Sequence, residues 1–148
     1  MSNFFVAGAA AMTSSRDDWE TPQALFEELD SVYHFTLDPC STHENAKCAR
    51  HFTKEEDGLS RSWAGEVVFV NPPYGRGMAD WARKCPEEAG GAIIVGLFPA
   101  RTDTRWFHDH IYGIAQIEFL KGRLKFEQNG IPSSPAPFPS MLVRWGNG

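Results

Sequence analysis

The sequence has no apolar run that approaches the roughly 20 residues needed to cross a membrane as a helix. It contains only three cysteines. That odd number, in a chain large enough to fold without disulfides, favours a reducing cytoplasm. Basic residues are outnumbered, with 14 Lys and Arg against 19 Asp and Glu. These shortages argue against a membrane-spanning protein and a disulfide scaffold, and they lower the expectation of nucleic-acid binding by net charge. We therefore expect a soluble cytoplasmic protein.

The charge is distributed unevenly along the chain. Residues 1–74 contain five basic and twelve acidic residues, whereas residues 75–148 contain nine basic and seven acidic residues. A basic face on the second half is therefore compatible with an acidic partner.

With 148 residues, of which 42% are hydrophobic and 22% charged, the chain has the composition of one globular domain. Met1–Thr13 is small and apolar but lacks the basic start of a secretion signal. We expect an N-terminal arm over residues 1–16, which is mobile or packs on the domain, and a single domain over residues 17–148.

Hydrophobic spacing predicts strands that alternate with helices, which indicates an α/β fold around a mostly parallel sheet. The last two strands, joined by a loop without a helix, are expected to form an antiparallel pair. Thr21 is expected to cap the first helix, Pro39 to end the first strand and Pro86 to stop the second helix early. The expected helices are Pro22–Asp30, Met78–Lys84 and Thr104–Ile111; the strands are Phe35–Asp38, Glu66–Val70, Ala92–Phe98, Ile114–Leu120 and Ser140–Trp145; Lys121–Pro139 is expected to be a loop.

The most specific feature is Asn71-Pro72-Pro73-Tyr74, directly after an apolar strand. The carboxyl ends of parallel strands are where α/β proteins bind ligands, and two prolines make the loop stiff. The Asn71 side-chain oxygen and the Pro72 carbonyl can both accept hydrogen bonds from one planar amino group, and Tyr74 offers a ring on which a planar substrate can stack. The structural alternative is a Pro-Pro turn that ends the strand, with Tyr74 in the core.

A second pattern, C-x2-H-x4-C-x2-H, is formed by Cys40, His43, Cys48 and His51. Two thiolates and two imidazoles can hold zinc tetrahedrally, so a structural zinc is a competing hypothesis, and Cys40 as a nucleophile is another. We expect neither, and predict no metal.

The tetrapeptide is the catalytic motif of S-adenosylmethionine-dependent amino-methyltransferases, and the chain resembles the phage-type DNA N6-adenine methyltransferases over about residues 17–145. That resemblance implies a compact Rossmann-like methyltransferase fold, S-adenosyl-L-methionine as cofactor and DNA as partner. It also implies direct transfer to the N6 amine of a flipped adenine. It rests on Asp18–Pro22, Leu37–Cys40, Glu44–Cys48, Asp57–Leu59, Asn71–Gly75, Pro99–Thr104, Lys121–Arg123 and Ala136–Ser140.

The resemblance also implies cofactor contacts in the first half of the chain. Thr21 would meet the methionine carboxylate, Asp38 the ammonium side, and Asp57 the adenine amine or ribose, although Asp57-Gly58 is also an ordinary turn signal. The superfamily's Asp-Pro-x-x-Gly-x-Gly motif has no glycines here, since residues 38–43 read DPCSTH. The cofactor loop must therefore be built differently, with Asn45 as a substitute polar contact. The full expected set is Trp19, Thr21, Pro22, Asp38, Pro39, Asn45 and Asp57.

Basic residues after the later strands are expected to contact DNA phosphates, although solvated surface charges are the alternative. They are Arg101, Arg105, Lys121, Arg123 and Lys125. Specificity would come from residues 75–80, residues 121–139 or a partner subunit, and a homodimer stays open. The alternatives in function are the same chemistry on cytosine N4 or a protein glutamine amide, or a non-enzymatic zinc- or cofactor-binding protein.

Overall fold

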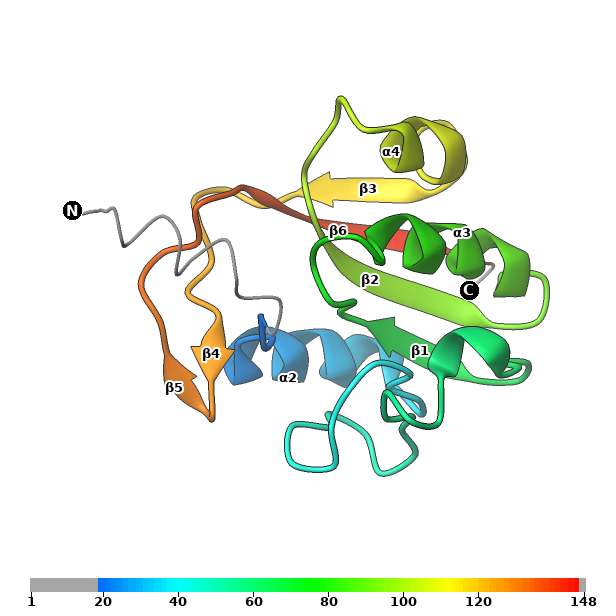
Figure 1. Cartoon of the computed structure of the whole chain (residues 1–148), viewed down its shortest axis with the longest axis horizontal. Helices are drawn as coiled ribbons and strands as arrows, with labels where there is room; N and C mark the ends of the chain where they lie inside the picture. Colours follow the sequence, from blue (N-terminus) through cyan, green and yellow to red (C-terminus); the bar gives the residue numbers. More distant parts are fainter. Residues whose placement is uncertain (1–18, 147–148) are drawn as a thin grey trace.

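A mixed four-stranded sheet forms the centre of the computed structural model, which describes residues 19–146 (Figure 1). Its strands lie in the order β1 (Val67–Val70), β2 (Ile93–Pro99), β6 (Ser140–Trp145) and β3 (Gln116–Phe119). β1 and β2 are parallel, whereas β6 runs antiparallel to both β2 and β3. The α/β class and the antiparallel pairing of the last two strands are thus confirmed. The expected arm over residues 1–16 lies outside the described residues.

The prediction of a mostly parallel sheet is wrong, because β6 inserts between β2 and β3 and contributes two antiparallel pairings. The strand expected over Phe35–Asp38 is reduced to isolated parallel bridges, from Leu37 to Val68 and from Asp38 to His51. Pro39 has no N–H with which to continue the ladder, so the pairing ends there.

The carboxyl ends of β1, β2 and β3 lie at the same edge of the sheet, because β2 and β3 both run antiparallel to β6 and β1 is parallel to β2. We call this the carboxyl edge. Ala100 and Leu120 leave it side by side, since their N–H groups donate to the carbonyls of Pro139 and Ser140 at 2.9 and 3.0 Å. The segments that follow these strands therefore start close together.

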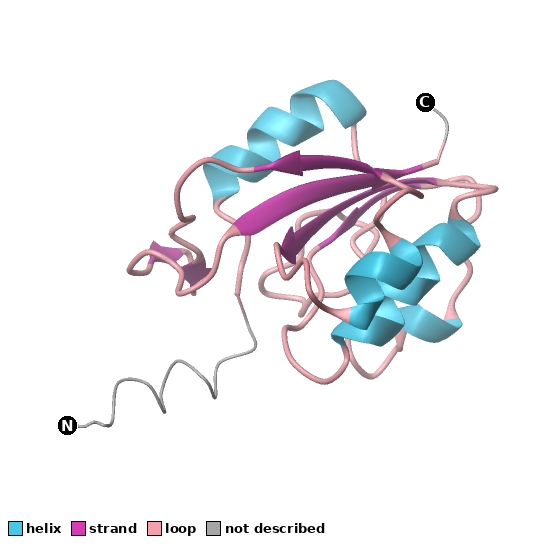
Figure 2. Cartoon of the chain, turned by 90° about the horizontal axis from the view of Figure 1, so that it is seen from above, coloured by secondary structure: helices cyan, strands magenta, loops and turns pink. Residues whose placement is uncertain are grey.

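Helices cover both faces of the sheet (Figure 2). α2 (Gln23–Tyr33) packs through Phe26 onto one face, and α3 (Met78–Glu88) and α4 (Arg105–His110) pack on the other. None of the helices between residues 19 and 146 has the length and apolar character that a membrane crossing requires.

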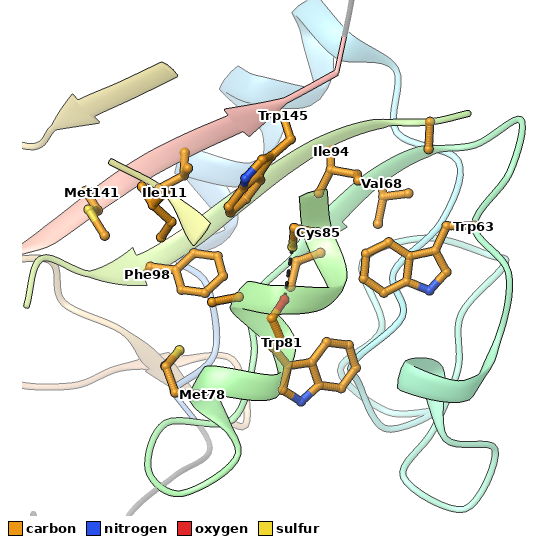
Figure 3. Packing of buried hydrophobic residues seen from close by; sticks show 14 of the residues in the cluster. Trp63, Val68, Met78, Trp81, Cys85, Ile94, Phe98, Ile111, Met141 and Trp145 are labelled. Carbon is orange, nitrogen blue, oxygen red and sulfur yellow. Dashed lines mark hydrogen bonds between the residues drawn. The ribbon is translucent and has the colours of Figure 1, made fainter. Parts of the chain in front are cut away.

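The larger core lies between the sheet and α3 and α4, and Figure 3 shows its side chains. Trp63 and Trp81 stack there with ring centroids 6.3 Å apart, and the Cys85 thiol donates to the Trp81 carbonyl at 3.2 Å. These contacts explain why α3 continues through Pro86 to Glu88, contrary to prediction. Proline removes one helical hydrogen bond, while the buried side chains before it hold the helix in place.

The segment Lys121–Pro139, predicted as a loop, contains a hairpin of β4 (Glu127–Gln128) and β5 (Ile131–Pro132). Its two-residue turn is Asn129-Gly130, with φ of 55° and 78°, as a type I′ turn requires. Glu127 in β4 also pairs with Glu20, so the hairpin holds the segment that leads into α2 (Figure 1).

The centre of β2 tolerates no side chain at Gly96. A Cβ atom there would lie 2.4 Å from Cε1 of Phe98, and the Trp145 ring is the next side chain at 3.4 Å. We expect Gly96→Ala to lower the free energy of unfolding by about 1–3 kcal/mol through overpacking. Gly90→Ala is the matched control, because nothing lies within 4 Å of its added Cβ. Urea unfolding of both variants checks this, and equal stabilities would contradict the packing described.

Candidate active site

A cavity of about 510 Å³ lies beside the carboxyl edge, within the size range of small-molecule sites. Six of the seven residues predicted to bind the cofactor line it: Trp19, Thr21, Asp38, Pro39, Asn45 and Asp57. Asn71, Pro72 and Pro73 of the predicted catalytic loop line it as well. Pro22 and Tyr74 do not line it.

The Asp38 carboxylate organises one wall of the cavity from a buried position, with 4% of the residue exposed. Its oxygens accept from the backbone N–H groups of Lys47 at 2.9 Å and Cys40 at 3.3 Å. Burial nevertheless raises the pKa of this carboxyl, and the two backbone hydrogen bonds oppose that shift. A buried carboxylate at a cavity wall is suited to meet a cationic group.

The glycine-free loop is closed by side-chain hydrogen bonds. The Thr42 N–H donates to Oδ1 of Asn45 at 2.8 Å, and the Asn45 N–H donates to Oγ1 of Thr42 at 3.1 Å. Asn45 therefore builds the loop as well as lining the cavity. Ser41 Oγ, on the same wall, is buried and has no hydrogen-bond partner among residues 19–146.

The neighbouring stretch of wall is formed by Asp57 and Gly58. Asp57 has a positive φ of 55°, and a Cβ atom on Gly58 would lie only 2.1 Å from the Pro39 carbonyl oxygen. The Trp63 indole holds this turn from the core side, donating to the Gly58 carbonyl at 3.1 Å. Glycine at position 58 thus allows the backbone at Gly58 to approach the backbone at Pro39 closely. The segment 38–43 has no glycine that could permit such an approach.

The Asn71 side chain has one satisfied end and one unsatisfied end. Its Nδ2 donates to the Trp19 carbonyl and, at 3.0 Å, to the Thr21 hydroxyl. Its Oδ1 is buried without a partner within the described part of the chain. Thr21 does not cap α2 as predicted, since the N-cap residue is Pro22 and the first helical N–H, of Gln23, donates to the Glu127 carboxylate at 3.0 Å.

Tyr74 lies in an aromatic cluster next to this amide, packed against the cores on both faces. Its ring centroid is 5.2 Å from that of Phe138, 6.1 Å from Phe126 and 6.4 Å from Trp19. The hydroxyl makes one long contact, of 3.4 Å, to the Leu97 carbonyl, and burial raises the pKa of this phenol. Half-buried in this way, Tyr74 combines a structural contact with a position beside Asn71.

The predicted DNA-binding residues are all exposed and follow β2 and β3 at the carboxyl edge. The Arg101 guanidinium lies 5.8 Å from the Phe138 ring centroid, one side chain away from Tyr74. Arg123 donates to the Ala136 carbonyl at 3.1 Å, which ties the start of the long segment to its end. The exposed set is Arg101, Arg105, Lys121, Arg123 and Lys125.

The Cys/His pattern does not assemble a metal site. His43 and His51 are hydrogen-bonded ring to ring at 2.8 Å, but between residues 19 and 146 no three His, Cys, Asp or Glu side chains are placed to share a metal ion. Burial and the Asp38 charge raise the pKa of the Cys40 thiol and bring that of Cys48 to about 12. Because burial disfavours the thiolate, both cysteines are poor nucleophiles in this structure.

Several cavity-lining residues were not identified from the sequence. They are Glu20, Cys40, Ser41, Thr42, Lys47, Thr53, Lys54, Gly58, Leu59, Phe69 and Trp81. Some of them, such as Cys40, Lys47 and Gly58, lie in the segments on which the resemblance rests, but none of them was expected to contact a cofactor.

An α/β domain with a cavity at the carboxyl edge of its sheet has the arrangement of an enzyme that binds a small molecule there. The family model described as DNA N-6-adenine-methyltransferase (Dam) matches residues 8–145. The chain therefore belongs to this family, which confirms the resemblance and assigns it to the adenine-specific DNA methyltransferases.

Two of the similar proteins come from phages. A DNA N-6-adenine-methyltransferase of Haemophilus phage HP1 is 26% identical over 136 residues, which cover 88% of this chain and 79% of that protein. A DNA N-6-adenine-methyltransferase of Escherichia phage T1 is 28% identical over 117 residues, or 78% of this chain and 49% of that protein. The chain thus spans about half the length of the phage T1 relative.

Burial of Asp38 predicts how the free energy of unfolding depends on pH. Because the folded state raises the pKa of this carboxyl, it retains the proton to a higher pH than the unfolded chain does. From about pH 4 upward, this group therefore costs stability until its folded-state pKa is passed. Asn cannot ionise, so we expect the unfolding free energy of Asp38→Asn minus that of wild type to increase with pH over this range. Urea unfolding at several pH values measures the difference, and one that falls with pH would contradict the burial effect.

Proposed function

We propose that this protein transfers a methyl group from S-adenosyl-L-methionine to the N6 amine of an adenine flipped out of duplex DNA. One observation carries the proposal. The Asn71 amide, beside the cavity, has its donor end satisfied and its acceptor oxygen unpaired. A buried acceptor without a partner costs about 1–3 kcal/mol, and such a cost points to a functional site.

The cavity suits the cofactor that we propose for it. The Asp38 carboxylate would accept from the ammonium group, and the Thr21 hydroxyl would donate to the carboxylate. The unpaired Ser41 Oγ and the close approach of Gly58 to Pro39 add a polar contact and a narrow wall. When bound, S-adenosylmethionine supplies an electrophilic methyl group on a sulfonium centre.

The catalytic loop would bind and orient the target amine. Asn71 Oδ1 and the Pro72 carbonyl accept its two hydrogens, which directs the nitrogen lone pair toward the cofactor side of the cavity. Since Asn71 Oδ1 is enclosed in this structure, the loop or its aromatic neighbours must shift when a base enters. Tyr74, at the centre of those neighbours, would then stack on the base.

DNA would lie along the carboxyl edge. Basic side chains after β2 and β3 leave the sheet there, and Arg101 reaches to within one ring of Tyr74. Phosphate contacts from these residues would position the duplex over the catalytic loop. Contact with DNA would depend on these local basic side chains and not on the net charge of −5.

Methyl transfer from labelled S-adenosylmethionine to unmethylated DNA tests the proposal, with the product digested to nucleosides and identified by mass spectrometry. We expect N6-methyladenosine in its deoxy form. Label in N4-methylcytosine, or in a protein acceptor, would instead assign the same chemistry to another amine, and absence of transfer to all of these acceptors would contradict the proposal.

We expect Asn71→Ala to lose about 10²- to 10³-fold in transfer rate, because the amine loses one of its two acceptors. Cofactor affinity should change little. Calorimetry with S-adenosylhomocysteine serves as the control for an intact cavity. A variant that keeps more than about a tenth of the wild-type rate is incompatible with Asn71 as a catalytic residue.

Variants of Tyr74 distinguish a role in stacking on the target base from a role in packing the core. Tyr74→Phe should remain active, because the hydroxyl makes only the 3.4 Å contact to Leu97. Tyr74→Ala should weaken target-base binding by about 1–3 kcal/mol, the usual value for base–aromatic stacking. The melting temperature is measured on the same preparations, since truncating a packed aromatic residue also lowers stability by about 3–5 kcal/mol. Activity lost only in proportion to unfolding would assign Tyr74 to the core alone.

A further inference from the structure

The orientation of the Asn71 amide is set by its surroundings. A side-chain amide can rotate so that its oxygen and nitrogen exchange places, and the hydrogen-bond network decides between the two orientations. Here both acceptors, the Trp19 carbonyl and the Thr21 hydroxyl, face Nδ2. The exchanged orientation would place Oδ1 against the Trp19 carbonyl, acceptor against acceptor. Oδ1 is therefore left as the unpaired end of the amide, which is the end that can accept from an amine.

Thr21 is itself held firmly. It is 2% exposed and lies between two attachments to Glu127. On one side, Glu20 exchanges backbone hydrogen bonds with Glu127 at 2.9 and 3.3 Å. On the other side, the Gln23 N–H donates to the Glu127 carboxylate at 3.0 Å. Thr21 thus presents its hydroxyl to Asn71 from a segment fixed by the β4–β5 hairpin.

The Thr21 hydroxyl can serve two sites at once. Its oxygen accepts from Asn71, while its hydrogen can be donated elsewhere. Because Thr21 and Asn71 both line the cavity, a cofactor carboxylate bound there would be a suitable acceptor for that hydrogen.

We propose that Thr21 is a positioning residue for Asn71, which locks the amide with its oxygen toward the target amine and links that orientation to the cofactor cavity. This inference rests on the proposed function. A corollary concerns position 71 itself: the pair of acceptors at Trp19 and Thr21 requires an amide there. A carboxylate in Asn71→Asp would place an oxygen against the Trp19 carbonyl.

The first test does not depend on activity. The side-chain amide hydrogens of Asn71, assigned by their loss in Asn71→Ala, are followed by NMR in wild type, Thr21→Val and Thr21→Ser. We expect slow hydrogen exchange in wild type and Thr21→Ser, and at least about tenfold faster exchange in Thr21→Val, which removes one of the two acceptors. Thr53→Val is the matched control, because Thr53 also lines the cavity but bonds Glu56 instead of Asn71. Exchange that is unchanged in Thr21→Val would overturn the inference.

The second test separates positioning from cofactor binding. At saturating cofactor, Thr21→Val should lower kcat by about 10- to 100-fold, while Thr21→Ser stays within about threefold of wild type. Asn71→Asp should lose at least as much as Thr21→Val. If Thr21→Val raises only the KM for the cofactor and leaves kcat intact, Thr21 binds the cofactor and does not position Asn71. If wild type transfers no methyl group while the NMR result holds, the proposed function fails and the orientation of the amide stands.

Discussion

The buried carboxylate of Asp38 is the constraint around which the cavity is arranged. It accepts from the backbone of Cys40 and Lys47, so the eight residues between Asp38 and Lys47 must turn back on themselves. The pairing of Asp38 with His51, through the backbone of Arg50 and Phe52, then fixes the far end of the same loop. The loop is thereby shaped by hydrogen bonds to one buried carboxyl group, whereas glycine-rich loops rely on the conformational freedom of the backbone. The close approach of two backbone segments that glycine permits occurs at Gly58, which lies against Pro39.

Several local signals in the sequence were informative. The apolar runs before Asn71 and before Pro99 specified buried strands, and the polar residues after them pointed to the edge where the cavity lies. Six of the seven expected cofactor residues line that cavity. Their roles toward a cofactor stay predictions.

Pairings between distant segments could not be anticipated. β6 lies between β2 and β3 and runs antiparallel to both. The local sequence of β6 does not indicate which strands it pairs with. Thr21 was expected to cap a helix because Thr before Pro is a local signal, yet its partner is Asn71, and the helix start is bonded by Glu127 from 104 residues beyond Gln23. The Asn129-Gly130 turn is a different case. That dipeptide is a strong hairpin signal, and it was overlooked inside a segment rich in Gly, Ser and Pro.

The position of β6 has a consequence for synthesis. β1 and β2 can pair as soon as both have left the ribosome, but β3 hydrogen-bonds only to β6 within this sheet. Until residues 140–145 emerge, β3 has no neighbouring strand, and the loops that leave its end are not held next to those of β2. The carboxyl edge is therefore complete only after β6 has been synthesised. Contacts between segments that lie far apart in the sequence also form slowly. A nascent chain that stops short of β6 would hold the Asn71 loop without a fixed arrangement of the basic segments that we propose as DNA contacts.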